Sequence, residues 1–274
     1  MTVFQSILLG IVQGLTEFLP VSSSGHLVIV PHLLGWHIPA NDAFVFDVLV
    51  QVATLVAVFA YFWRDIIGII QAFLLGLIHR QPFADPLSRE GWLIILATIP
   101  AGVIGLALKH AVEQAFSSLL ATAIFLFVTA FLLLLAEWVG KRSRTIAQLS
   151  WAGALWIGLF QALAIFPGVS RSGATIAGGM TRDLQRPEAA RFSFLMAIPI
   201  MLAAGLAASL DLIKIPNLGA LLPAFIPGFI TAAIVGYLAI RWLLRYLTSH
   251  PLYIFSIYVA LLGLVALIAS LFGL

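Results

Sequence analysis

Six long apolar stretches dominate the pattern of hydrophobic and polar positions along this chain. A bilayer hydrocarbon core about 30 Å thick requires about 20 apolar residues for each crossing helix. The segment 66–79 is apolar but would reach only about 21 Å as a helix, which favours an interfacial helix or an extension of the preceding one. The predicted transmembrane helices are 43–63, 91–108, 118–138, 191–211, 218–241 and 252–273.

Two further apolar stretches, 3–34 and 150–180, are interrupted near their middle by proline, glycine and serine. The interruptions read PVSSSG at 20–25 and PGVSRSG at 167–173. A helix loses backbone hydrogen bonds at such residues, and irregular backbone at membrane depth is tolerated only inside protein or beside a wet cavity. We therefore predict two re-entrant helix-loop-helix hairpins beside the six transmembrane helices, in an all-α integral membrane protein.

Composition supports this fold class and excludes several functions. Hydrophobic residues make up 62% of the 274 positions and charged residues 9%, which rules out a water-soluble domain. Cysteine is absent, so disulfides, thiolate zinc sites and cysteine nucleophiles are excluded. The fourteen Lys and Arg residues are spread along the chain, and we therefore expect no nucleic-acid partner. Membrane lipid is the expected surrounding.

The predicted topology separates the basic residues between the two sides of the membrane. Eleven Lys and Arg residues fall in or beside connections on one side, while Lys109 and Lys214 fall on the other and Arg171 lies within the second hairpin. Positive charge is retained in cytoplasmic connections. This places both termini and hairpin 3–34 on the outer face, with hairpin 150–180 entering from the cytoplasm.

The chain also repeats itself at an offset of 148 positions. The repeat divides the single membrane domain 1–274 into residues 1–148 and 149–274, each with one hairpin and three crossings. Because three is odd, the second half is inverted relative to the first, as in transporters whose broken helices meet near the bilayer midplane. The matched pairs include Gly10 with Gly158, Gln13 with Gln161, Ser22 with Ser170, Ser24 with Ser172 and Gly25 with Gly173.

The two hairpins differ at the positions that carry chemistry. The first has Glu17, Ser23 and His26 where the second has Ile165, Arg171 and Ala174. An ionised side chain at membrane depth costs about 2.5–3.5 kcal/mol, so the acid and the guanidinium need partners. We expect the two tips to meet and to combine these groups in one pocket.

Gln13 and Glu17 are four residues apart and therefore share one face of the first helix of the hairpin. An amide oxygen and a carboxylate suit a hard divalent cation such as Mg²⁺ or Ca²⁺, with substrate or water completing the coordination. The alternative is a helix-interior Glu17 that is satisfied by a neighbouring polar group.

The serine-rich segments place hydroxyl and backbone N–H groups at helix N-termini, which bind anions. Simple N-capping is the alternative, but Arg171 has a planar fork that matches phosphate oxygens. Together with an acid and an imidazole, this favours phosphoryl transfer, with Ser23 or His26 as nucleophile and the other assisting proton transfer. The candidate substrate-binding residues are Ser22, Ser24, Gly25, Ser170, Ser172, Gly173 and Thr175.

Asp47 and Gln51 form a weaker candidate pair on one face of the first crossing helix. We include both among the substrate-binding residues, because they lie about one turn inside the predicted membrane boundary. The alternative is that they anchor this boundary.

The stretches QGLTEFLPVSSSGH (13–26) and PGVSRSGAT (167–175) closely resemble the two signatures of the bacitracin-resistance family of undecaprenyl-diphosphate phosphatases. The resemblance covers essentially the whole chain. It implies a multi-pass enzyme of the bacterial cytoplasmic (inner) membrane with interlocked inverted repeats and an active site that faces the periplasm. Such an enzyme uses a divalent cation to remove the terminal phosphate from undecaprenyl diphosphate, which recycles the lipid carrier for peptidoglycan and gives bacitracin resistance.

The resemblance also implies roles for individual residues. Glu17 would be the acidic metal-binding or catalytic residue, His26 the catalytic imidazole, Ser23 a hydroxyl at the reacting phosphorus and Arg171 the clamp on the diphosphate. Some family members have Glu where this chain has Gln13. The amide at this position argues against a metal site built from two carboxylates. The further phosphate donors would be Ser170, Ser172 and Thr175.

Two other functions compete with this interpretation. One is the class of type 2 phosphatidic acid phosphatases, whose signature requires a His six residues after an Arg. This chain has Ala177 six residues after Arg171, so it lacks that signature. An inverted-repeat transporter or polyprenyl-phosphate flippase is the main alternative, because broken helices suit alternating access. The expected partner is a polyprenyl diphosphate lipid, and a homodimer is compatible with the sequence.

Overall fold

The computed structural model describes residues 1–116, 118–212, 215 and 218–272, and it confirms an all-helical membrane protein. Six of its helices are long and apolar enough to cross a bilayer: α3, α4, α6, α9, α10 and α11. The helices are α1 (Val3–Phe18), α2 (Ser23–Leu33), α3 (Ala40–Ile78), α4 (Pro86–Ala107), α5 (Lys109–Phe116), α6 (Leu119–Val139), the 3₁₀ turn η1 (Ile146–Gln148), α7 (Trp151–Leu163), α8 (Arg171–Met180), α9 (Arg186–Leu212), α10 (Leu218–Tyr246) and α11 (Tyr253–Phe272).

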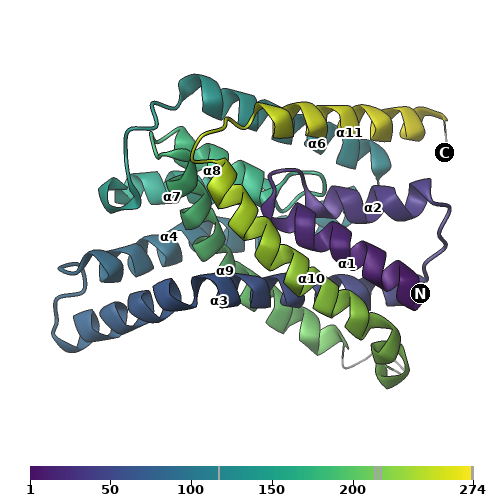
Figure 1. The fold of residues 1–274 in the computed structure, drawn as a ribbon, viewed down its shortest axis with the longest axis horizontal. Coiled ribbons are helices and arrows are strands. Elements are labelled where there is room, and N and C mark those ends of the chain that lie inside the picture. Colours follow the sequence, from purple (N-terminus) through teal and green to yellow (C-terminus); the bar gives the residue numbers. More distant parts are fainter. Residues whose placement is uncertain (117, 213–214, 216–217, 273–274) are drawn as a thin grey trace.

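The segment 66–79 is an extension of the first crossing helix and not a separate interfacial helix. α3 is 39 residues long and bends where Phe62 leaves helical geometry, with φ −100° and ψ 19°. Its second part and the start of α4 project together from the rest of the molecule (Figure 1). The short helix α5 was not predicted, because eight residues of mixed polarity between two apolar stretches resemble a loop.

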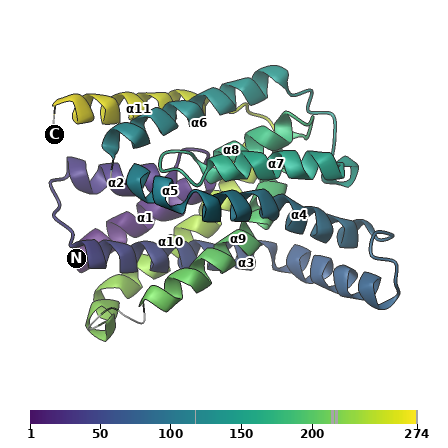
Figure 2. The same ribbon diagram turned by 180° about the vertical axis from the view of Figure 1, so that it is seen from behind.

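Both described ends of the chain lie at one end of the molecule, together with the connection α2–α3, the end of α9 and the start of α10 (Figures 1 and 2). The connections α3–α4 and α6–α7 lie at the opposite end. Lys214, one of the two basic residues expected on the outer side, lies outside the described residues.

The interrupted stretches each form two helices joined by an irregular turn. Residues 19–22 separate α1 from α2, and residues 164–170 separate α7 from α8. α1 packs chiefly on α10, and α7 packs chiefly on α4. Glycine permits both close approaches, because a Cβ at Gly10 would collide with the carbonyl of Gly228, and one at Gly158 would collide with the carbonyl of Ala97. Each hairpin therefore packs on a helix from the other half of the chain.

Two groups of ion pairs involve charged residues of the crossing helices. The guanidinium of Arg191 on α9 binds Asp65 of α3 and Glu90 of α4, with N–O distances of 2.7 Å to each. The carboxylate of Glu137 on α6 binds Arg142 and Arg186. These ion pairs give Arg191 and Glu137 partners of opposite charge in an otherwise apolar structure.

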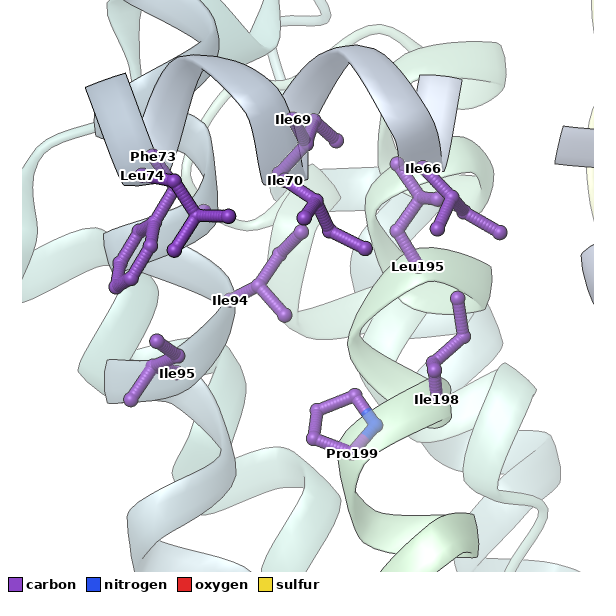
Figure 3. Close-up of a pocket in the computed structure, with 11 residues that line it drawn as sticks. Ile66, Ile69, Ile70, Phe73, Leu74, Ile94, Ile95, Leu195, Ile198 and Pro199 are labelled. Carbon is purple, nitrogen blue, oxygen red and sulfur yellow. The ribbon is translucent and has the colours of Figure 1, made fainter. Parts of the chain in front are cut away.

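An apolar cavity of about 240 Å³ lies between α3, α4 and α9. Ile66, Ile70, Ile94 and Ile198 point into it (Figure 3). None of the residues lining this cavity belongs to the predicted site. The cavity therefore offers hydrocarbon contacts and no polar chemistry.

Candidate active site

The turns of the two hairpins meet in the middle of the molecule. Nη2 of Arg171, the first residue of α8, donates a hydrogen bond to Oε1 of Glu17 in the last turn of α1 over 2.9 Å. Both side chains are largely buried, at 15% and 10% exposure. The structure thus brings together the acid and the guanidinium that the sequence places 154 residues apart.

Two further hydrogen bonds join the turns. The hydroxyl of Ser172 donates to the carbonyl of Leu19 over 3.1 Å, and the backbone N–H of Gly168 donates to Oγ of Ser24 over 3.3 Å. Each hairpin therefore uses a serine of its own second helix to bind the irregular turn of the other.

Glu17 accepts hydrogen bonds from three different side chains. Besides Arg171, the amide Nε2 of Gln13 donates to Oε2 over 3.0 Å, and the hydroxyl of Ser23 donates to the same oxygen over 2.7 Å. Hydrogen bonds from three side chains hold the carboxylate of Glu17 in one orientation. The Ser23 contact also places a proton acceptor directly on the hydroxyl of a candidate nucleophile.

Two buried polar atoms beside Glu17 have no hydrogen-bond partner among the described residues. They are Oε1 of Gln13, an acceptor, and Nη1 of Arg171, a donor. Buried polar groups are usually satisfied, so these atoms point to a ligand or to water. The amide oxygen suits a hard cation and the guanidinium suits an anion.

The helices that follow the two turns are capped in the same way. Oγ of Ser22 accepts from the N–H of Gly25 over 3.2 Å, and Oγ of Ser170 accepts from the N–H of Gly173 over 3.0 Å. The N-termini of α2 and α8 thus both adjoin the Glu17–Arg171 pair. Two helix N-termini at one place add partial positive charge to that of the guanidinium.

His26 is buried, and its ring contacts a different part of the molecule. Its Nδ1 lies 2.7 Å from the carbonyl oxygen of Ser22, and its Nε2 lies 2.8 Å from the hydroxyl of Tyr258 on α11. The hydrogen bonds described for His26 reach neither Glu17 nor Arg171. The structure thus brings Glu17, Ser23 and Arg171 into direct contact, with His26 one helical turn beyond Ser23.

Thr175 is fully buried, and its hydroxyl is bonded within the protein. It donates to the carbonyl of Arg171 over 2.7 Å and lies 2.6 Å from the hydroxyl of Ser193 on α9. On α6, Oγ1 of Thr129 accepts from the N–H of Ser170 over 2.9 Å. The hydroxyls of Thr129 and Ser193 fix the second hairpin, and sequence reasoning missed both because they are single polar residues in apolar helices.

Asp47 and Gln51 both lie on α3 and belong to neither hairpin. Asp47 lines a cavity of about 270 Å³ between α1, α2 and α3, together with Leu9, Leu27 and His32. Gln51 is exposed on the surface of α3. The hydrogen bonds described at the Glu17–Arg171 pair include neither residue. Leu9 and Leu27 lie one helical turn from Gln13 and Ser23, so this cavity adjoins the site from the end of the molecule that carries the termini.

Comparison with known proteins places this chain in a family. Residues 6–265 match the model of the family described as bacitracin resistance protein BacA. The chain belongs to the BacA family. It is also similar over nearly its whole length to proteins named undecaprenyl-diphosphatase.

Three such relatives illustrate the similarity to the BacA family. A protein from Thermomicrobium roseum is 44% identical, with 100% of both chains covered. One from Chlorobium phaeovibrioides is 45% identical over 98% of this chain and 97% of the relative. One from Methanosphaera stadtmanae is 42% identical over 98% of both chains. The similarity therefore includes both hairpins and all six long apolar helices.

Proposed function

We propose that this protein is an undecaprenyl-diphosphate phosphatase. It hydrolyses undecaprenyl diphosphate to undecaprenyl phosphate and inorganic phosphate, recycles the lipid carrier for peptidoglycan synthesis and gives bacitracin resistance. Membership of the BacA family and the names of its relatives support this activity. The observation that carries the chemistry is the buried contact of Arg171, Glu17 and Ser23 between two helix N-termini.

Arg171 binds the terminal phosphate of the substrate in this proposal. Its Nη1 is unpartnered and its Nη2 is engaged with Glu17, so one edge of the guanidinium is available to an anion. The first-turn N–H groups of α2 and α8 complete a cradle for phosphate oxygens. Donors that are already oriented stabilise the charge that develops on the transferring phosphoryl group.

Ser23 is the nucleophile that the geometry favours. Its Oγ attacks the terminal phosphorus while Glu17 accepts its proton, the bond from phosphorus to the bridging oxygen breaks, and undecaprenyl phosphate leaves. Water then attacks the phosphoserine, which releases inorganic phosphate and returns the proton to Ser23. His26 is not the nucleophile in this proposal, because both of its ring nitrogens are already hydrogen-bonded, one to Ser22 and one to Tyr258. Its role is to assist proton transfer.

A divalent cation, Mg²⁺ or Ca²⁺, fits the donors beside the nucleophile. The unpartnered Oε1 of Gln13 and the carboxylate of Glu17 supply oxygen ligands, and no cluster of three or more acidic or histidine side chains that could hold a metal occurs in the described part of the chain. The remaining ligands would come from substrate and water. When bound, the cation neutralises charge on the diphosphate.

The membrane arrangement is part of the same proposal. We place the two hairpins as re-entrant elements of an inverted repeat in the bacterial inner membrane, with the site open to the periplasm and its polyprenyl chain in the surrounding lipid. The odd number of crossings in each half and the concentration of Lys and Arg on one side support this arrangement. The matched capping of α2 and α8 supports the repeat.

Phosphate release by the purified protein tests the activity. In detergent, it should release phosphate from farnesyl or undecaprenyl diphosphate, and EDTA should abolish this. Arg171→Ala should lower kcat/KM by about 10³-fold, whereas Arg245→Ala, at an exposed position on α10, should match the parent protein. Full turnover by Arg171→Ala would remove the clamp from the mechanism.

Trapping the phosphoryl intermediate tests the nucleophile. Phosphoserine survives acid and phosphohistidine does not, so rapid quenching in acid after mixing with substrate labelled at the terminal phosphate distinguishes Ser23 from His26. Label that is retained in acid and lost in Ser23→Ala supports the proposal. Label that is lost in acid and retained in base would transfer the role to His26.

Single cysteines test the orientation, because the chain itself has no cysteine. Asn41 and Ser143 are exposed near opposite ends of the molecule. In intact cells, an impermeant thiol reagent should label Asn41→Cys and should label Ser143→Cys only after permeabilisation. The reverse pattern would invert the proposed topology.

A further inference from the structure

Tyr258 on α11 makes two contacts with the imidazole of His26. The hydroxyl of Tyr258 lies 2.8 Å from Nε2. The two rings are nearly parallel, with centroids 5.7 Å apart and planes inclined by 7°. Both the hydrogen bond and the stacking restrict rotation of the imidazole ring.

The second ring nitrogen of His26 is fixed from within the first hairpin. Nδ1 lies 2.7 Å from the carbonyl oxygen of Ser22, and a carbonyl oxygen can only accept, so Nδ1 carries a hydrogen. Ser22 presents this carbonyl from a left-handed backbone conformation, with φ 70°, which is unfavourable for a residue other than glycine. Strained backbone of this kind is concentrated at functional sites.

These contacts determine which ring nitrogen of His26 carries the hydrogen in the neutral imidazole. With Nδ1–H bonded to Ser22, the neutral imidazole has its lone pair on Nε2, and the hydroxyl of Tyr258 donates to that lone pair. The same hydroxyl oxygen can accept from Nε2–H when the ring is protonated. Tyr258 therefore remains a partner of His26 in both protonation states.

We propose that Tyr258 is a positioning residue that acts through His26, holding the imidazole in the Nδ1–H tautomer and in one orientation, one helical turn from Ser23. The inference rests on the proposed phosphatase function for the role of His26. Tyr258 itself contacts neither Glu17 nor Arg171 in the described hydrogen bonds. Its side chain is 46% exposed on α11. Tyr258→Phe removes its hydroxyl and keeps its ring.

The tautomer can be measured directly by ¹⁵N NMR of histidine-labelled protein in detergent, with His26→Gln used to assign the signals. The parent protein should give one protonated Nδ1 and one unprotonated Nε2 for His26 at neutral or mildly alkaline pH. An Nε2–H tautomer or an equal mixture in the parent protein would overturn the proposal without recourse to any variant.

Tyr258→Phe keeps the ring and removes only the hydroxyl. It should shift the Nε2 signal of His26, give a mixture of tautomers and lower kcat by about tenfold with little change in KM, because one orienting hydrogen bond is lost. Tyr253→Phe is the matched control, since Tyr253 lies on the same helix with 45% exposure. It should leave both the spectrum and kcat unchanged.

The outcomes separate this inference from the function on which it rests. An unchanged His26 spectrum in Tyr258→Phe would overturn the positioning role, even if the parent protein is an active phosphatase. A changed spectrum with an unchanged kcat would also overturn it, because the orientation of His26 would then not matter for turnover. A parent protein that releases no phosphate would contradict the proposed function, and the spectra would still report the pairing of Tyr258 with His26.

Discussion

The two hairpins have the same cap and the same fold but differ in how firmly they are held. Every residue from Ser172 to Met180 in α8 is buried, whereas the buried residues of α2 are Gly25, His26 and Ile29. α8 packs against α6, α7 and α9, while α2 has its main contacts with α1 alone. The second hairpin is therefore the more firmly packed of the two and presents Arg171, and the first carries the proposed reacting groups on a less supported helix.

This division suggests how a repeated element acquires chemistry. The shared serine and glycine positions preserve the turn and the helix N-terminus in both copies. The differing positions, Glu17 opposite Ile165 and Ser23 opposite Arg171, place the acid and hydroxyl on one side and the guanidinium on the other. A contact between the copies then assembles a site that neither copy has alone.

The largest expected effect comes from removing the hydroxyl that contacts Glu17. Ser23→Ala should lower kcat by about 10⁴-fold or more, because a covalent nucleophile is lost. Ser172→Ala is the matched change in the second hairpin, where the hydroxyl donates to the carbonyl of Leu19 and lies 3.1 Å from the hydroxyl of Ser170, and it should cost about tenfold or less. Phosphate release measures both. Equal losses in the two variants would contradict the division of roles.

A somewhat smaller effect is expected from Glu17→Gln. This change keeps the shape of the side chain but removes the proton acceptor for Ser23 and the charge that pairs with Arg171, so kcat should fall by about 10³-fold. Phosphate release under substrate saturation is the measurement. Retention of more than a tenth of parent turnover would mean that Glu17 neither accepts the proton nor orients the clamp.

The packing difference predicts unequal effects on stability at equivalent positions. A Cβ at Gly178 would lie 2.9–3.0 Å from side-chain atoms of Phe160, so Gly178→Ala should overpack the second hairpin, at a cost of about 1–3 kcal/mol. Val30 occupies the corresponding place in α2 and is only partly buried. Val30→Ala should therefore lower the thermal unfolding midpoint in detergent less than Gly178→Ala does. The opposite order would show that the first hairpin is the more firmly packed.

The smallest effect concerns motion in the unmodified protein. Backbone amides of α2 should exchange with deuterium faster than those of α8, because local opening is easier where fewer apolar contacts must be broken. Mass spectrometry of peptides covering residues 23–33 and 171–180 measures the difference. A non-hydrolysable diphosphate analogue should slow exchange in α2 more than in α8.

Much of the fold follows from local sequence features. The six crossing helices are predictable because about 20 consecutive apolar residues have few other stable arrangements. The two hairpin turns are predictable because proline, glycine and serine interrupt helices in a characteristic way. The bend at Phe62 is not, since neither proline nor glycine marks it and it arises where α3 packs against Phe194 of α9.

The site was predictable only in part, for a related reason. The repeat identifies Glu17, Ser23 and Arg171 as departures from a shared pattern, so comparison of the halves is sufficient to select them. Tyr258 has no such signal, because it is one aromatic residue among many in an apolar helix and it meets His26 across 232 positions. Likewise, sequence spacing alone does not reveal that the hydroxyl of Thr175 is hydrogen-bonded within the core to the carbonyl of Arg171 and the hydroxyl of Ser193.

The packing of α1 against α10 has a consequence for biosynthesis. The surface that supports the N-terminal helix is made by residues 218–246, which are synthesised near the end of translation. During most of synthesis, α1 and its acidic residue lack their main neighbour and must be sheltered by lipid, by the insertion machinery or by transient contacts. A truncated product that ends before α10 should therefore lack an assembled site, even though it contains every residue that we assign to catalysis.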